Sequence, residues 1–252
     1  MGFLKKHLSS VSFILTILSI SCVSTPPIYM PNTLNTTLLQ EKGEINIGYN
    51  KSPAGYDIAA SYALLDNIGI MVNGTYLSNK RPEQNRRHKL GEVGIGYFFQ
   101  PKEHLVGEIF LGAGLGSNLI KEKKSYFPFL FFIYLPIEPD QEEEDFIYLN
   151  ADYIRFFLQS TFGLRKKIFE VGLSLRLCYI NFYKIHHSNI DFPRENTLLE
   201  PVFFIRIGPP VLKFQMQFGT SFSPFENPDA QGDIFYDDRI SGAGFTVMLN
   251  IK

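Results

Sequence analysis

The chain has 252 residues, a formal net charge of -1 and a pI near 6.5, which excludes the strongly basic surface typical of nucleic-acid-binding proteins. Aromatic residues make up 15% of it, and no segment offers the roughly 20 consecutive apolar residues that a membrane-spanning helix needs. The length suits one all-β barrel domain or two small domains.

Residues 1–21 have the composition of a secretory signal peptide, with two early lysines and a short apolar stretch over 11–20. They end in LSISC, which resembles a bacterial lipobox, although Leu18 lies four rather than three residues before Cys22. We expect cleavage before Cys22 and acylation of this cysteine. An ordinary signal peptide with an incidental cysteine is the alternative. The only other cysteine is Cys178, so acylation of Cys22 would leave no disulfide pair.

Residues 22–42 follow as a linker. Pro26, Pro27 and Pro31, together with Asn and Thr, predict extended and irregular chain. We therefore expect a lipidated periplasmic tether over 22–42, followed by a barrel over 43–252.

Strand patterns recur from residue 44 onward, without a helical period. Alternation and turn residues predict ten strands. Their expected ranges are 44–50, 56–64, 68–77, 89–99, 105–116, 148–164, 168–182, 198–207, 211–221 and 239–251.

Most of these strands have one apolar and one polar face. In IFEVGLSLRLCYINF, residues 168–182, the odd positions from Phe169 to Tyr179 are apolar, and the even positions include Glu170 and Arg176. The polar faces are rich in glycine, and their charges nearly cancel. These charges predict a lumen network of Glu44, Glu92, Glu108, Arg155, Glu170, Arg176, Arg206 and Lys213.

The connections alternate between short and long. Tight turns are expected at 65–67, 100–104, 165–167 and 208–210, and long segments separate most of them. Transmembrane barrels show this asymmetry, with short periplasmic turns and long extracellular loops. An even strand count then places both termini on the short-turn side. A charge facing lipid at the midplane would cost about 2–4 kcal/mol, so the polar faces are expected to line the lumen.

The segments YMPNTLNTTLLQEKGEINIGYN, YDIAASYALLDNIGIMVNGTY, YIRFFLQSTFG and FEVGLSLRLCYINF resemble small outer-membrane barrel proteins of Bacteroidota. The resemblance covers nearly the whole mature chain. It implies an all-β, antiparallel, up-and-down transmembrane barrel in the outer membrane, and it supplies no catalytic residues. Surface-exported lipoproteins of that phylum carry acids after the cysteine, so CVSTPP fits an anchor in the periplasmic leaflet.

A catalytic rim is one alternative. The segment YKIHHSNID offers His186, His187, Ser188 and Asp191, but residues so close along one loop rarely form a nucleophile, base and orienting acid. No third ligand is suitably spaced for a metal held by the two histidines. We expect a solvated loop, and neither a cofactor nor a metal.

The longest connection, 117–147, combines a basic cluster, an aromatic core and an acidic run. It is expected to pack as a hairpin tip or to plug the lumen. Alternatively, it exposes Phe129, Phe131 and Phe132 to a protein partner.

Three function classes follow. The favoured one is an outer-membrane lipoprotein with a structural or interaction role, such as an accessory subunit of a larger complex, in contact with membrane lipid. The others are a small pore, with Phe98, Arg155 and Phe157 in its lumen, and a rim enzyme acting on lipid or peptide.

Overall fold

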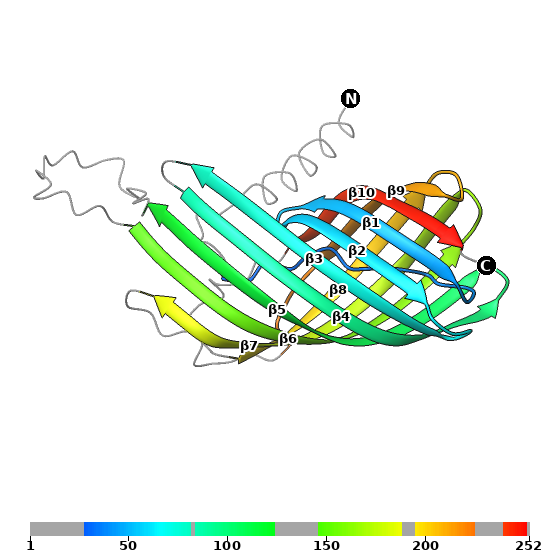
Figure 1. Ribbon diagram of the computed structural model, residues 1–252, viewed down its shortest axis with the longest axis horizontal. Coiled ribbons are helices and arrows are strands. Elements are labelled where there is room, and N and C mark those ends of the chain that lie inside the picture. The colour runs from blue at the N-terminus through cyan, green and yellow to red at the C-terminus, as the bar shows by residue number, and fades with distance from the viewer. Residues whose placement is uncertain (1–27, 82–83, 124–145, 188–194, 225–238, 251–252) are drawn as a thin grey trace, which may run out of the picture.

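The computed structural model describes residues 28–81, 84–123, 146–187, 195–224 and 239–250. Ten antiparallel strands form one closed barrel, in which each strand pairs with its neighbours in sequence and β1 pairs with β10 (Figure 1). The strands are β1 Glu44–Ser52, β2 Gly55–Ala63, β3 Ile68–Arg81, β4 Gln84–Lys102, β5 Leu105–Lys123, β6 Phe146–Arg165, β7 Phe169–His187, β8 Glu195–Ile207, β9 Leu212–Thr220 and β10 Arg239–Asn250.

The structure confirms the predicted fold class: an all-β, up-and-down barrel of ten strands. The predicted signal peptide and Cys22 lie outside the described residues. Among the residues that are described, no helix is long and apolar enough to cross a membrane.

The barrel is taller on one side. Strands β4, β5 and β7 have 19 residues each and β6 has 20, whereas β1, β2 and β9 have nine. About 9–11 tilted residues suffice to cross a bilayer. The long strands therefore extend well past that length at the end where the long connections lie, which we call the long-loop end (Figure 1). The opposite end is the short-turn end.

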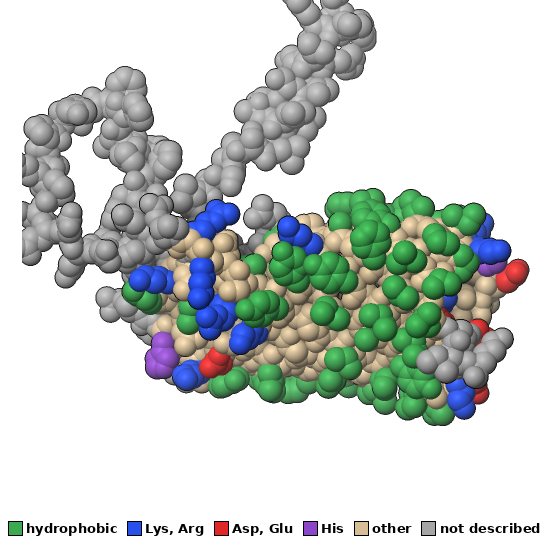
Figure 2. All heavy atoms as spheres, turned by 45° about the horizontal axis from the view of Figure 1, so that its top comes forward, with side chains coloured by type: hydrophobic (Ala, Val, Ile, Leu, Met, Phe, Trp, Pro, Cys, Tyr) green, Lys and Arg blue, Asp and Glu red, His purple; other side chains and the backbone are tan. Residues whose placement is uncertain are grey.

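The outer surface of the barrel is apolar. Leu173, Leu111 and Val93 are 64%, 61% and 60% exposed, and hydrophobic side chains cover much of the outside in Figure 2. Aromatic pairs bridge neighbouring strands on this surface, as Phe214 and Phe245 do, with ring centroids 5.5 Å apart. Apolar side chains outside and charged side chains inside reverse the usual distribution of a protein in water.

Candidate functional site

The lumen is filled by the chain's own N-terminal segment. Residues 28–39, here called the plug, are all buried, although they precede β1 and belong to no strand. At one end of the plug, Asn118 Nδ2 on β5 donates to the carbonyl of Ile28 at 2.7 Å. Just past the other end, the N–H of Gln40 donates to Glu44 Oε2 at the start of β1, at 2.9 Å. This arrangement differs from the expected linker, because residues 28–39 run inside the barrel.

The plug crosses the barrel from end to end. Asn118 lies toward the long-loop end of β5, and Glu44 lies at the short-turn end, where β10 also finishes. Figure 1 shows this blue segment passing along the barrel interior before β1 begins. β1 starts at the predicted short-turn end, but the chain reaches it through the lumen. Residue 28 therefore lies at the end opposite to the one expected for the N-terminus.

Barrel side chains supply hydrogen bonds for the plug backbone. The amide of Gln217 on β9 accepts from Leu34 N at 2.9 Å and donates to Leu34 O at 2.7 Å. Asp57 on β2 accepts from both the N–H and the hydroxyl of Thr33, at 3.2 and 2.8 Å. Glu108 accepts from the Thr37 hydroxyl and the Leu39 N–H, at 2.5 and 2.6 Å. An irregular buried segment needs such partners, because its N–H and C=O groups have no strand neighbour.

Arg155, near the middle of β6, joins the plug to β4, the second strand along the barrel wall. It pairs with Glu92 of β4, whose Oε1 lies 2.8 Å from Arg155 Nε, and both side chains are buried. The same guanidinium donates to the hydroxyl of Tyr29 and, at 2.8 Å, to Asn32 Oδ1. One buried cation thus holds two plug residues and one barrel acid.

A second buried pair lies beside the first. Arg176 Nε is 2.5 Å from Glu200 Oε2, and Arg176 Nη2 donates to Asn32 Oδ1 at 3.1 Å. Glu200 also accepts from the Tyr29 hydroxyl at 3.2 Å and from the Cys178 thiol at 3.5 Å. Cys178 is therefore a buried side chain within this network.

A third cluster lies toward the short-turn end. Glu170 of β7 is 2.8 Å from Arg206 Nη1 and 2.7 Å from Lys213 Nζ, and Arg165 approaches it at 3.2 Å. Arg206 donates to the carbonyl and the hydroxyl of Thr36. Arg165 also pairs with Glu44 at 2.5 Å and donates to the carbonyl of Leu38 at 2.7 Å.

Leu38 is the one non-glycine residue of the described chain with a positive φ, at 50°. It is buried against Val106 and Phe204, and its carbonyl is bound by Arg165. A left-handed leucine costs roughly 1–3 kcal/mol and persists only where its surroundings over-determine it. The base of the plug is therefore held by both packing and charge.

Glycines of the barrel wall make room for the plug. A Cβ added at Gly69 would lie 2.7 Å from Leu39 Cδ1, and one at Gly163 would lie 2.8 Å from Leu38 Cδ1. A Cβ at Gly242 would collide with the Thr33 side chain. The predicted glycine-rich face is thus the face against which the plug packs.

All eight residues of the predicted charge network are buried. Seven of them form ion pairs, and Glu108 instead binds the plug. Phe98 and Phe157 are buried in the same core cluster.

Sequence reasoning missed several members of the site: Tyr29, Asn32, Asp57, Arg165 and Glu200. The alternation could have found Glu200, because it is in phase with Arg206 on the predicted strand 198–207.

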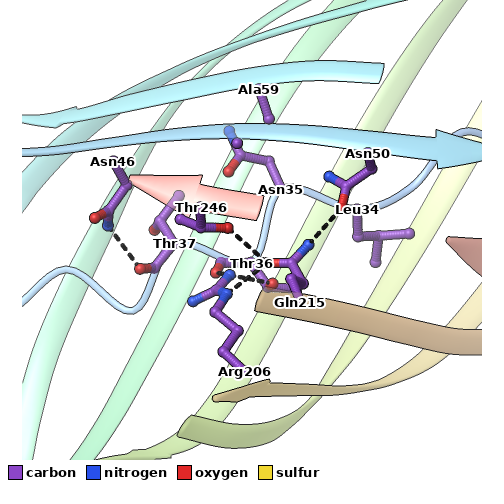
Figure 3. A pocket seen from close by; sticks show the side chains of 11 residues that line it. Leu34, Asn35, Thr36, Thr37, Asn46, Asn50, Ala59, Arg206, Gln215 and Thr246 are labelled. Carbon is purple, nitrogen blue, oxygen red and sulfur yellow. Dashed lines mark hydrogen bonds between the residues drawn. The ribbon is translucent and has the colours of Figure 1, made fainter. Parts of the chain in front are cut away.

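The filled lumen leaves little space for a ligand. A cavity of about 10 Å³ lies between the plug and the wall, lined by Asn46, Arg206, Gln215 and Thr246 among others (Figure 3). That is about the size of one water molecule. Asn46 Nδ2 donates to the carbonyl of Thr37, and no partner for Asn46 Oδ1 is found among the described residues.

The remaining candidate residues are not brought into a site. His186 is exposed on β7, and His187 is the last residue of that strand. Within the described ranges, no group of three or more His, Cys, Asp or Glu is arranged to hold a metal ion. The other candidates lie outside the described residues: Cys22, Phe129, Phe131, Phe132, Ser188 and Asp191.

No known family model and no curated protein matches this sequence.

Proposed function

We propose that the protein is an outer-membrane β-barrel with a structural or interaction role, closed by its own N-terminal segment. The observation that carries this proposal is an apolar outer wall around a lumen filled by residues 28–39. A ten-stranded barrel is only modestly wider than the eight-stranded case, whose side chains fill the interior. Here the additional width is occupied by chain, which argues against the pore alternative.

The outer wall supports a membrane location. Its exposed leucines, valines and aromatics would have an unfavourable free energy in water, whereas lipid accommodates them. The alternation of short and long connections supports the orientation expected of outer-membrane barrels, with the long-loop end outside the cell.

Acylation of Cys22 remains part of the proposal, but the plug changes its expected side. Cys22 precedes Ile28 by six residues, which extended chain can stretch over at most about 22 Å. Ile28 lies at the long-loop end, so we expect a lipid on Cys22 to insert from that side. This departs from the anchor in the periplasmic leaflet that CVSTPP first favoured.

The interaction role is proposed for the segment 117–147. The connection is shorter than predicted, because residues 117–123 belong to β5 and residues 146–147 to β6. These two strands are long enough to carry the remaining residues, 124–145, beyond the apolar wall. We propose that Phe129, Phe131 and Phe132 contact a protein partner there.

Replacing Leu173 with Arg should impair membrane assembly. Leu173 is 64% exposed on the outer wall, and an arginine facing lipid at mid-depth costs about 2–4 kcal/mol. The measurement is the fraction of protein that resists heat unfolding on a gel after membrane extraction.

Tyr183→Arg is the matched control, because Tyr183 is exposed on the same strand near its long-loop end. It should assemble like the wild type. Normal assembly of Leu173→Arg would contradict the membrane location.

A further inference from the structure

Basic side chains gather on the outside of the barrel at the long-loop end. Figure 2 shows lysine and arginine side chains there, beside the hydrophobic surface. Strand alternation places four cations on the outward face of β3, β4 and β5, and the register shift after Phe182 places Lys184 of β7 opposite the outward-facing Asp152. The five cations are Lys80, Arg87, Lys89, Lys121 and Lys184, here called the basic band, and all but the half-buried Lys121 are exposed.

The basic band has little opposing charge. On the described outward-facing positions of β3–β7 beyond Gly91, the acid is Asp152, which is half-buried and is the register partner of Lys184. On the next strand, the exposed Glu195 of β8 accepts a hydrogen bond from Asn181 of β7. The short-turn end is mixed by comparison: Lys102, Lys166 and Lys167 are exposed there with Asp66 and Glu103. The excess of positive charge therefore belongs to one end of the barrel.

An open depression of about 450 Å³ joins the basic band to the apolar wall. Lys89, Ser117, Asp152 and Tyr183 are among the residues that line it, as are Gly91 and Leu115. Gly91 contributes to this space, since a Cβ built there would meet nothing within 4 Å. Leu115 is 62% exposed. The depression thus combines an apolar side, a tyrosine, the cation of Lys89 and the carboxylate of Asp152, whose register partner is Lys184.

We propose that the basic band binds the phosphate-bearing headgroup of a membrane lipid, with an acyl chain lying along the wall beside Leu115. Lysine and arginine form charge-assisted hydrogen bonds to phosphate oxygens, and cations at a membrane surface attract anionic lipids. A tyrosine such as Tyr183 suits the boundary between hydrocarbon and headgroups. The inference rests on the proposed membrane location, because only there does the band face a leaflet.

The chain carries one competing occupant, the acidic run EPDQEEED over 138–145. The depression favours the lipid, because it continues into the apolar wall, which an acidic segment would not use. The test below separates the two occupants.

The test measures lipid binding to the full chain in a non-ionic detergent. The probes are phosphatidic acid, diacylglycerol with the same chains, and inorganic phosphate. Phosphatidic acid should bind at least about tenfold more tightly than the other two, and added salt should weaken its binding. Arg87→Glu with Lys89→Glu should lower the affinity about tenfold or more.

The matched control reverses two cations at the short-turn end, Lys166→Glu with Lys167→Glu, and should leave the affinity unchanged. Equal binding of diacylglycerol or of inorganic phosphate would overturn the proposal. So would an equal loss in the control pair, or unchanged binding after reversal of Arg87 and Lys89. Equal heat resistance of both variants would show that the comparison is between folded proteins.

A further variant replaces the acids of 138–145 with their amides. It should bind phosphatidic acid as the wild type does. If phosphatidic acid bound only after this replacement, the acidic run 138–145 would be the occupant of the basic band in the wild type, and the proposal would be overturned. Because binding is measured in detergent, loss of lipid selectivity leaves the assembly test at Leu173 standing, so the two failures are distinguishable.

Discussion

Replacing Arg155 with Leu should lower the free energy of unfolding by about 3–5 kcal/mol, because it leaves Glu92 as a buried charge without its cation. The same change removes the hydrogen bonds to Tyr29 and Asn32, so the plug loses its main tie to β6. The measurement is urea unfolding in detergent, followed by the loss of the β-sheet circular dichroism signal.

Two controls distinguish the loss of the buried ion pair from the loss of an arginine in general. Arg87→Leu removes an arginine that is exposed on the outer face, and it should change the free energy of unfolding by about 0.5 kcal/mol or less. Glu92→Gln combined with Arg155→Leu should cost less than the sum of the two single changes, because no unpaired charge remains. If Arg155→Leu were as mild as Arg87→Leu, the buried network would not stabilise the barrel.

Removing the plug should open a conducting lumen. The barrel is first folded intact, with a protease site inserted between Lys42 and Gly43, next to the exposed residues Glu41 and Lys42 at the short-turn end. After cleavage, mild urea should release the plug, because the plug is then no longer covalently joined to β1 and only its non-covalent contacts to the wall hold it. Planar-bilayer recordings should show no current before release and discrete current steps after it.

A synthetic peptide of residues 28–40 should close the lumen again, and a scrambled peptide of the same composition should not. The physical reason is the pattern of specific bonds, such as Asp57 to Thr33 and Gln217 to Leu34, which a scrambled sequence cannot reproduce. Current through the intact protein, equal to that after release, would show that residues 28–39 do not seal it.

The barrel could be predicted because its signal is local. The odd positions of 169–179 are apolar and the even positions between them are small or polar, and the structure keeps this alternation as an outward and an inward face. The long strands extend past the prediction: 89–99 became Gln84–Lys102. In the added residues 84–88 the outward position 87 is an arginine, so the apolar alternation that marks a strand is lost there.

The plug could not be predicted in the same way. Its prolines, asparagines and threonines lack the apolar–polar alternation of a strand, so the sequence predicts a linker there. Its partners come from distant strands, as for Leu34 and Gln217, which are 183 residues apart. Local periodicity carries no information on such pairs. One sequence feature of the wall is related to the plug: Gly69, Gly163 and Gly242 are glycines at positions where plug side chains come close.

The central claim, that residues 28–39 lie inside the barrel, is tested most directly by an engineered disulfide between Thr33→Cys and Gly242→Cys. A Cβ at Gly242 would lie 3.7 Å from Thr33 Cβ, within the range of about 3.5–4.5 Å seen in disulfides. Cys22 and Cys178 are replaced with Ser so that no other thiol competes, and cross-linked peptides are identified by mass spectrometry after non-reducing digestion.

The matched control moves the second cysteine by one residue to Ala243, which is exposed on the outer face. A disulfide is expected between positions 33 and 242, and none between positions 33 and 243. A missing bond in the first pair, or equal yields in both pairs, would contradict a plugged lumen.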